Sequence, residues 1–409
     1  MRALDERGAK SVYVDGGQVI RTFLRAGLID ELTITTVPVL IGTGVPLFGP
    51  LGRDVPLRHL STHVLGAGVV QSAYAVEGGR VTLRPPCAER GGTMPRTWLT
   101  ERFELQVPLV GAPMAGVSDG RLAGAVSAAG ALGMFGVPPS VPVSWIEEQA
   151  GIAAASGRPY GIGLLAWGLS DEHLKAVLRV RPALVSVSFG DYAPYVEPLR
   201  AAGITVAVQA GTTEEAVQAE RAGVDVVVAR GGEGGGHGRD DVATLPLLQT
   251  VLDAVQVPVL AAGGIATARG LAAVLAAGAE GGWAGTAFLG CTETTLPPEG
   301  LRRVLDAGET GTAYGRVFDV AQGLPWPPEY GGRALRNTFY DRWRGREDEL
   351  ARDEQARAGL EAARQGRDFD TAYVYAGQAV GTVTRERDAA DVVAGFAAAD
   401  KLLSRFAAP

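Results

Sequence analysis

The sequence predicts an α/β protein whose main part is a closed (β/α)₈ barrel, the TIM barrel. Short apolar runs alternate with alanine-rich helical stretches about eight times over roughly 200 residues, as buried parallel strands and their crossover helices do. The 57 glycines exceed the ordinary share and suit many tight turns. Several helical stretches also end in an Ala-Gly pair, and glycine readily takes the left-handed conformation that stops a helix. These glycines are Gly130, Gly203, Gly223, Gly278 and Gly308.

Residues 1–86 precede the barrel and predict a partial α/β domain. We expect a helix over residues 19–26 and strands over residues 11–15, 31–40, 57–65 and 69–76. Residues 87–96 contain glycines and polar residues in a pattern typical of a linker. The chain is therefore expected to divide into two units.

The barrel is expected over residues 97–313. Its strands are predicted at residues 108–112, 132–137, 160–165, 184–189, 204–209, 224–229, 257–262 and 282–289, with helices between them such as 213–222 and 266–277. A doubly wound sheet is the alternative, but it usually has fewer strands and leaves the last two units without a place. Residues 314–409 break the alternation and predict a C-terminal helical extension, with a charged, solvated helical excursion over 333–367 and a terminal helix over 389–406.

Composition excludes several classes of function. The net charge of −7 gives no basic face for nucleic acid or anionic lipid, and the apolar runs are too interrupted for a membrane span. Two cysteines, Cys87 and Cys291, are too few for a disulfide framework or a cysteine metal site, and no His/Asp/Glu cluster has the spacing of metal ligands. No export signal is evident at the N-terminus, so we expect a cytoplasmic protein. From the charge, the apolar runs and the cysteine count, we expect no metal and no nucleic-acid or membrane partner.

Chemistry in this kind of barrel lies at the carboxyl ends of the strands, and the turn after the sixth strand is unlike a simple connection. It runs Arg230-Gly-Gly-Glu-Gly-Gly-Gly-His237, where glycines let the backbone approach a ligand and the histidine is a candidate acid or base. A flexible loop with an incidental histidine is the alternative. We favour His237 as the catalytic histidine, because His59, His63 and His173 lie in strand-like or helical segments that suit a structural or surface role.

Two glycine clusters follow the seventh and eighth strands, where this fold usually binds phosphate. Gly263 and Gly264 lie in Ala-Ala-Gly-Gly-Ile, and Gly285 and Thr286 lie in Gly-Thr-Ala-Phe. Backbone N–H groups at such turns and at a helix N-terminus hold an anion, so the pair of clusters predicts a phosphate-bearing ligand. Neither a P-loop nor a strand-borne GxGxxG motif occurs in this region, which disfavours a nucleotide bound in either of those ways.

A third turn, after the first strand, contains Pro113, Met114 and Ala115 within Ala-Pro-Met-Ala-Gly. Proline and its small neighbours would let the backbone approach the edge or face of a ring. A simple connecting turn has the same composition, so this motif does not decide between the two interpretations by itself.

Taken in order, six motifs resemble those of the nitronate monooxygenase family, formerly called 2-nitropropane dioxygenases. They are Val-Gly-Ala-Pro-Met-Ala-Gly116, Val208-Gln-Ala-Gly-Thr-Thr-Glu-Glu-Ala216, Glu233-Gly-Gly-Gly-His237, Ala-Gly-Gly-Ile-Ala266, Gly-Thr-Ala-Phe288 and Tyr375-Ala-Gly-Gln378. The resemblance covers residues 97–409 and implies FMN bound to the barrel. It assigns the phosphate to Gly263, Gly264, Gly285 and Thr286, the isoalloxazine to Pro113, Met114 and Ala115, and further cofactor contacts to Gln209, Arg230, Gly235 and Gln378.

The same resemblance implies an activity. FMN would oxidise an alkyl nitronate with O₂, giving a carbonyl compound and nitrite, while His237 hydrogen-bonds the nitronate oxygens or removes the α-proton of a nitroalkane. A small-molecule nitronate or related anion and O₂ are thus the expected partners. Alternatives are an FMN-dependent NAD(P)H:quinone or enoyl-thioester reductase on the same scaffold, and a barrel that only binds FMN or a phosphate metabolite.

Two positions depart from the family pattern. Arg230 stands where the family usually has Gln, and Gly163 stands where it often has Asn, and both positions commonly contact flavin. Arg230 would bring a fixed positive charge near the flavin or its phosphate, which would stabilise reduced anionic flavin or bind an acidic substrate.

The N-terminal segment resembles a different family, the dihydrofolate-reductase-like domain of riboflavin-pathway reductases. The motifs are Val12-Tyr-Val-Asp-Gly-Gly17, Phe23-Leu-Arg-Ala-Gly-Leu-Ile-Asp-Glu-Leu32 and Pro38-Val-Leu-Ile-Gly-Thr-Gly-Val-Pro-Leu-Phe48, all from the C-terminal half of that domain. Gly16 and Gly17 would meet NADPH phosphates, and the implied activity is NADPH-dependent reduction of a pyrimidine or pteridine. Because the first half of the domain and most of its substrate pocket are missing, we interpret the segment as a remnant or a fusion.

Overall fold

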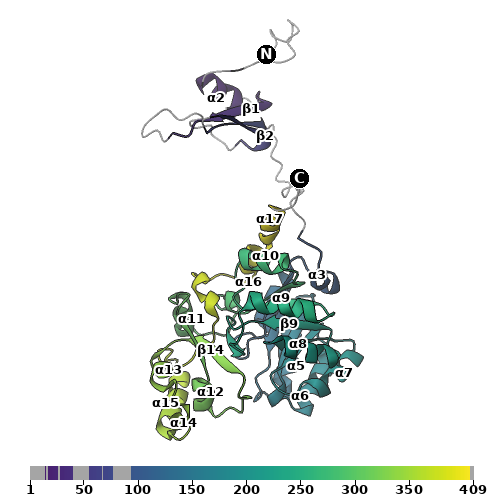
Figure 1. The fold of residues 1–409 in the computed structure, drawn as a ribbon, viewed down its shortest axis with the longest axis vertical. Coiled ribbons are helices and arrows are strands. Elements are labelled where there is room, and N and C mark those ends of the chain that lie inside the picture. The colour runs from purple at the N-terminus through teal and green to yellow at the C-terminus, as the bar shows by residue number, and fades with distance from the viewer. Residues whose placement is uncertain are drawn as a thin grey trace. The chain divides into compact units, whose positions relative to one another are not determined.

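The computed structural model describes residues 14, 17–25, 28–39, 55–66, 68–76 and 94–405 (Figure 1). The chain divides into two compact units, Met1–Glu89 and Arg90–Pro409, and each is described by itself. The strand predicted over residues 11–15 lies outside the described residues except for Val14, and Gly16, Cys87 and most of the predicted linker also lie outside them.

The described residues of the first unit form a helix and three antiparallel strands. The helix is α2 (Gly17–Arg25), and the strands are β1 (Glu31–Thr36), β2 (Leu57–Gly66) and β3 (Val69–Val76). β3 is the central strand and pairs with β1 on one side and β2 on the other. The turn between β2 and β3 contains Gly68 at φ +76°, a conformation that glycine takes without strain. The predicted helix and three of the four predicted strands are confirmed.

The second unit is built on a closed barrel of eight parallel strands, which confirms the TIM barrel over the doubly wound sheet. The strands are β4 (Leu109–Gly111), β5 (Leu132–Gly136), β6 (Tyr160–Leu165), β7 (Leu184–Ser188), β8 (Thr205–Ala210), β9 (Val226–Arg230), β11 (Val259–Ala262) and β12 (Gly281–Ala284). Their order is β11-β12-β4-β5-β6-β7-β8-β9, and β9 pairs with β11 to close the ring. Each predicted strand corresponds to one of these. The last is shorter than predicted because the chain turns into the 3₁₀ helix η2 (Thr286–Phe288).

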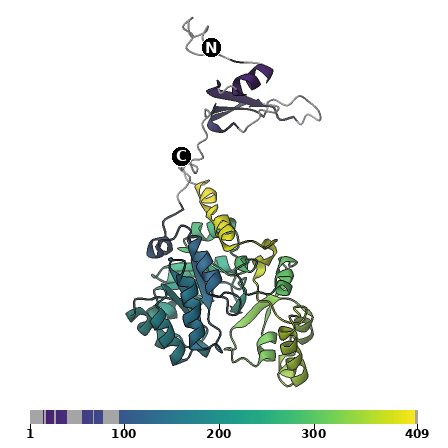
Figure 2. The same ribbon diagram turned by 180° about the vertical axis from the view of Figure 1, so that it is seen from behind.

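Helices cover the outside of the barrel (Figures 1 and 2). They are α4 (Gly120–Ala128), α5 (Val143–Ala154), α6 (Asp171–Val180), α7 (Ala193–Ala201), α8 (Thr213–Arg221), α9 (Thr244–Ala254) and α10 (Ala268–Ala276). Gly130, Gly203, Gly223 and Gly278 follow four of these helices with φ between +79° and +103°, as predicted. The prediction for Gly308 was wrong. The helix before it, α11 (Pro298–Leu305), has already ended, and the Gly308 carbonyl accepts a turn hydrogen bond from the Gly311 N–H (2.9 Å).

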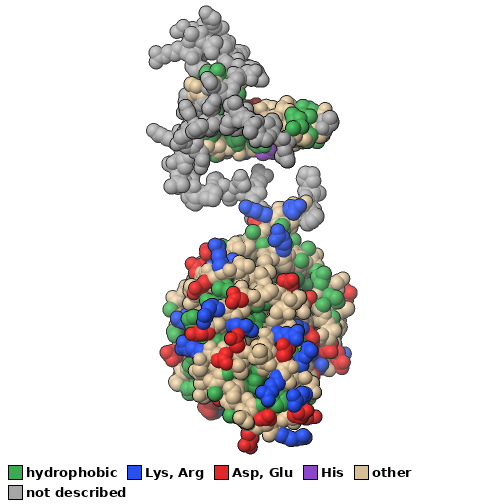
Figure 3. Space-filling model, turned by 90° about the vertical axis from the view of Figure 1, so that its left-hand side faces the viewer, with side chains coloured by type: hydrophobic (Ala, Val, Ile, Leu, Met, Phe, Trp, Pro, Cys, Tyr) green, Lys and Arg blue, Asp and Glu red, His purple; other side chains and the backbone are tan. Residues whose placement is uncertain are grey.

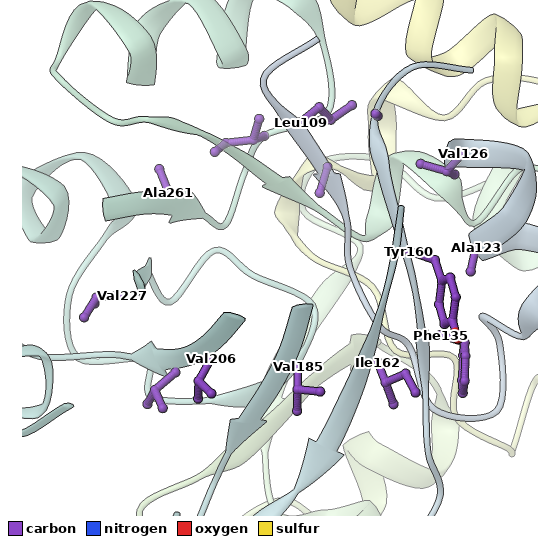
Figure 4. Close-up of a cluster of buried hydrophobic side chains, with 14 of the residues drawn as sticks. Leu109, Ala123, Val126, Phe135, Tyr160, Ile162, Val185, Val206, Val227 and Ala261 are labelled. Atoms are coloured by element: carbon purple, nitrogen blue, oxygen red, sulfur yellow. The ribbon is translucent and has the colours of Figure 1, made fainter. Parts of the chain in front are cut away.

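Two apolar layers hold the barrel together. Outward-facing strand side chains, among them Phe135, Ile162 and Val185, pack toward the helices (Figure 4). Inward-facing side chains fill the interior, and the short helix α3 (Trp98–Phe103) adds Leu99 and Phe103 to them. The Arg102 side chain of α3 donates to the Thr205 hydroxyl at the first residue of β8 (3.2 Å). The amino ends of the strands are therefore closed by α3, which leaves the carboxyl ends for a ligand.

An extension follows the barrel and packs beside it (Figure 1). Its sheet has the antiparallel order β10-β14-β13, with β10 (Gly236–Gly238), β13 (Thr312–Gly315) and β14 (Gly331–Leu335). Its helices are α12 (Val317–Gln322), α13 (Thr338–Trp343), α14 (Glu347–Leu350), α15 (Glu354–Gln365), η3 (Gln378–Thr382), α16 (Ala389–Ala397) and α17 (Ala399–Ser404). The sequence predicted the helices of this extension but not its sheet. The prediction that the charged stretch 333–367 is solvated was wrong at its first residue, because Arg333 lies in β14 and is buried. An apolar cluster with Phe318, Phe339 and Trp343 lies under this charged stretch.

The surface of the second unit carries charges of both signs. Lys and Arg side chains are interspersed with Asp and Glu on the face shown in Figure 3. Within the described ranges, no helix is long and apolar enough to cross a membrane. No group of three or more His, Cys, Asp or Glu side chains in that part of the chain is placed to hold a metal ion.

Candidate active site

The two glycine clusters lie at the carboxyl ends of the adjacent strands β11 and β12. Gly263 and Gly264 have φ of +107° and +68°, which is the left-handed region that favours glycine. A Cβ on Gly263 would lie 2.5 Å from the Thr244 hydroxyl oxygen, so no larger residue fits there. Gly285 follows β12, and a Cβ on it would lie 3.4 Å from the Met114 sulfur. Side chains therefore do not cover the backbone of these two turns, and the turns lie close to the third predicted turn. We call Gly263, Gly264, Gly285 and Thr286 the glycine cradle, because this arrangement fits the binding of a phosphate group.

Segments far apart in sequence meet at this cradle. The Thr286 hydroxyl accepts a hydrogen bond from the Gly377 N–H (2.9 Å), and the Gln378 N–H donates to the Glu233 carbonyl (2.9 Å). Gly235 approaches so closely that an added Cβ would lie 2.5 Å from the Gly377 nitrogen. The structure therefore brings three predicted cofactor residues, Gly235, Thr286 and Gln378, into one neighbourhood.

The turn after β4 packs across the neighbouring strands. A Cβ on Gly136 would lie 2.5 Å from the Ala115 nitrogen, and a Cβ on Gly163 would lie 2.4 Å from Cβ and Cγ of Pro113. The Pro113 ring thus fills the space that a side chain at position 163 would need. This packing gives a physical reason for the Gly163 departure, because an asparagine there would collide with Pro113.

Gln209 lies at the carboxyl end of β8, with its N–H donating to the Ser188 hydroxyl (3.0 Å). Alternate strand residues face the same way, and Ala207 belongs to the interior cluster. Gln209 is therefore on the strand face that lines the barrel interior, near its open end.

Arg230 is the last residue of β9, and its side chain is buried. Its guanidinium donates to the carbonyls of Gly234, Gly235 and Gly236 at 3.0 to 3.1 Å and to that of Arg239 at 3.4 Å. Burial lowers the pKa of Arg230 to about 10, so the group stays charged at neutral pH. These bonds indicate that Arg230 braces the glycine loop, a role that the sequence did not suggest.

His237 is the central residue of β10 and pairs with Gly332 of β14. Its Nε2 lies 2.7 Å from Oδ1 of Asp319, and both side chains are nearly inaccessible to solvent. The indole of Trp326 stacks on the imidazole, with ring centroids 3.5 Å apart and an angle of 6° between the planes. The Tyr375 hydroxyl donates to the same Asp319 oxygen (3.3 Å), and burial raises its pKa well above the usual value, so it remains a donor.

This arrangement gives the imidazole a defined chemistry. A carboxylate bound at Nε2 favours a proton on that nitrogen, which leaves Nδ1 free to accept a proton or, when protonated, to donate to an anion. The sequence missed Asp319 and Trp326. A single acidic residue on the apolar helix Val-Phe-Asp-Val-Ala, and a tryptophan between prolines, were the available signals. His173 Nε2 lies 2.9 Å from the Val141 carbonyl, and His59 Nε2 lies 2.6 Å from the Thr62 hydroxyl, so both of these imidazoles lie against protein groups that are not part of the glycine loop.

Comparison with known proteins assigns the second unit to a family. The family model for nitronate monooxygenase matches residues 144–398. The chain belongs to the nitronate monooxygenase family. The resemblance predicted from the motifs is confirmed. Residues 1–71 match the model of the RibD C-terminal domain, which confirms the second resemblance.

Several individual proteins are similar to this chain in sequence or in structure. The nitronate monooxygenase of Pseudomonas aeruginosa is 33% identical over 301 residues, covering 57% of this chain and 85% of that protein. The (3aS,4S,5R,7aS)-5-hydroxy-7a-methyl-1-oxo-octahydro-1H-indene-4-carboxyl-CoA dehydrogenases of Rhodococcus jostii and Mycobacterium tuberculosis are both 35% identical over 56% of this chain. The matches span 64% and 65% of those two proteins, which is less than two thirds of either. The structure of nitroalkane oxidase from Streptomyces ansochromogenes has a TM-score of 0.65 at 30% identity, covering 75% of this chain and 99% of that one.

Proposed function

We propose that the second unit binds FMN and oxidises alkyl nitronates with O₂, giving a carbonyl compound and nitrite. The observation that carries this proposal is His237, which is held by Asp319 at 2.7 Å on the loop that also borders the glycine cradle. A fixed imidazole next to a phosphate cradle is what a flavin enzyme needs to bind an anionic substrate beside its cofactor. The family membership supports the same activity.

The cofactor would be held mainly by backbone. Its phosphate would lie at Gly263, Gly264, Gly285 and Thr286, where glycine conformation and close packing leave no side chain in the way. The isoalloxazine would lie along the turn containing Pro113, Met114 and Ala115, and Gln209, Arg230, Gly235 and Gln378 would line the rest of the site. When bound, FMN supplies a two-electron acceptor that can be reoxidised by O₂.

The side chains of the protein would bind and orient the substrate. With the Nε2 proton donated to Asp319, Nδ1 of His237 would take the α-proton of a nitroalkane or, already protonated, hydrogen-bond the nitronate oxygens. The buried carboxylate of Asp319 would stabilise positive charge as it develops on the ring. Trp326 would keep water from one face of the imidazole, because its indole covers that face.

Anaerobic mixing of the FMN-loaded chain with the nitronate of 2-nitropropane tests the proposal. We expect the visible flavin absorbance to be lost with release of at most one nitrite per flavin, and nitrite to accumulate over repeated turnovers once O₂ is admitted to reoxidise the flavin. An unchanged spectrum would rule the activity out. A His237→Ala variant with undiminished turnover would favour a barrel that merely binds its ligand.

A second candidate function is an FMN-dependent oxidoreductase that acts on a thioester or quinone with NAD(P)H. The dehydrogenases of Rhodococcus jostii and Mycobacterium tuberculosis, which are named for a CoA thioester and are 35% identical, favour this alternative. Anaerobic mixing with NADH or NADPH separates the two, because the compound that bleaches the flavin is the electron donor. Reduction of a pyrimidine or pteridine by the first unit is tested separately with a fragment that ends near residue 90.

A further inference from the structure

Four aromatic side chains gather at the carboxyl ends of β6 and β7. Trp167 lies in the 3₁₀ helix η1 (Ala166–Gly168) after β6, and Phe189 follows β7 directly. Trp326 and Tyr330 come from the segment between α12 and β14. The ring centroids of Trp326 lie 5.1 Å from Trp167 and 5.6 Å from Phe189, and Phe189 lies 5.3 Å from Tyr330. We call these four residues the aromatic cluster.

The aromatic cluster faces the glycine cradle across the barrel mouth. In the closed strand order, β6 is four places from β11 and β7 is four places from β12, so these strands are diametrically opposed. His237 lies in β10, on the loop whose residues Glu233 and Gly234 approach the glycine turns, and its imidazole stacks on Trp326 of the cluster. A ligand with its phosphate at the glycine turns would therefore extend past His237 toward the cluster, where a substrate would bind.

The cluster has features that simple packing does not require. Phe189 has φ +66°, a left-handed conformation that is strained for a bulky side chain and is typical of binding sites. The indole N–H of Trp167 is buried without a hydrogen-bond partner among the described residues, as is that of Trp343 in the extension. Trp167, Phe189 and Tyr330 are only half-buried, so a ligand can still contact their rings. These features together indicate a wall that is completed by a ligand.

The charges around the cluster favour an apolar occupant. The hydroxyl of Tyr330 donates to Glu215 (3.1 Å), and the same carboxylate also accepts from Arg239 (2.6 Å) and from the Gly211 N–H (2.7 Å). The charges of Glu215 and Arg239 thus neutralise each other and leave no charged group in these contacts unpaired. The rings themselves offer aromatic faces and edges, which bind other aromatic rings in stacked or edge-to-face geometry.

We propose that the aromatic cluster binds an aryl group of the substrate, so that the enzyme prefers aryl-bearing nitronates to short alkyl nitronates. This inference rests on the proposed function for the role of His237, which would meet the anionic end while the cluster meets the ring. The substrate class is an arylalkyl nitronate.

Calorimetric titration of the FMN-loaded full chain with unreactive carboxylates tests the inference without turnover. Phenylpropanoate and propanoate imitate the anions of phenyl-substituted and short substrates. We expect phenylpropanoate to bind roughly ten-fold tighter or more, as burial of a phenyl ring predicts. Equal affinities, or no binding of either, would overturn the inference.

A matched pair of variants locates the preference. Phe189→Leu should reduce the ratio of the affinities for phenylpropanoate and propanoate at least three-fold. Phe369→Leu alters another half-buried phenylalanine, which lies outside the cluster, and should leave that ratio unchanged. Retention of the full preference in Phe189→Leu would also overturn the inference. If phenylpropanoate binds as expected but the nitronate of phenylnitroethane does not reduce the flavin, the proposed function fails while the aromatic site stands.

Discussion

The contact between His237 and Asp319 allows the sharpest test of the site, by means of the variant Asp319→Asn. The substitution keeps the shape of a buried residue but removes its charge, and the 2.7 Å contact with Nε2 becomes a bond between neutral groups. Hydrogen bonds to charged groups contribute about 1.5–3 kcal/mol, compared with about 1 kcal/mol for neutral pairs. At 1.36 kcal/mol for each factor of ten, the loss of about 0.5–2 kcal/mol corresponds to a decrease of roughly 2- to 30-fold in the rate of the step that His237 assists.

Stopped-flow measurement of anaerobic flavin reduction by a nitroalkane, together with FMN titration, provides the assay. We expect the reduction rate constant to fall while the affinity for FMN stays within about two-fold. Asp341→Asn is the control, because Asp341 makes an exposed ion pair with Arg336 (2.7 Å) and such pairs contribute little. A rate in Asp319→Asn equal to that of the unmodified enzyme would refute the role given to Asp319.

Three further predictions concern the cradle, the loop and a buried thiol. Gly263→Ala should weaken FMN binding at least ten-fold, because the φ of +107° and the 2.5 Å approach to the Thr244 hydroxyl exclude a methyl group. Gly151→Ala, on an open helix surface, is the control and should bind FMN normally. Equal affinity for FMN in both variants would contradict the phosphate site at the glycine turns. Arg230→Gln should lower the free energy of unfolding in urea by about 2 kcal/mol, because three loop carbonyls lose a charged donor; an unchanged urea midpoint would show that the loop does not need it. Burial raises the pKa of Cys291 from 9.0 to about 12, so above pH 9 the unfolded chain releases this proton before the folded chain does, and stability falls as pH rises. Replacement Cys291→Ala should reduce that fall by up to about 1.4 kcal/mol per pH unit in urea melts, and identical slopes would argue against the shift.

The barrel could be predicted from sequence because its signal is local and repeated. Each strand is buried on both faces and has the sequence of a short apolar run, and four of the seven helices around the barrel end at a glycine that has the expected positive φ. The glycine turns could also be found, since their place after the seventh and eighth strands follows from the strand count.

The extension sheet and the partners of His237 could not be predicted in the same way. β10 is only Gly-His-Gly, and it pairs with β14, almost a hundred residues later, which itself begins with two glycines. Asp319 lies 82 positions from His237, and only the fold of the extension brings the two together. For Arg230 the sequence showed the charge, but only the path of the loop shows that its carbonyls surround the guanidinium.

The central claim is that bare backbone at the carboxyl ends of β11 and β12 binds the phosphate of FMN beside His237. Parallel fluorescence titrations of flavin-free protein with FMN and with riboflavin, which lacks the phosphate, test it most directly. We expect saturable binding of one FMN per chain and at least a hundred-fold weaker binding of riboflavin, because a phosphate held by several backbone donors contributes about 3 kcal/mol or more. Equal affinity for the two flavins, or no binding of FMN, would contradict the account.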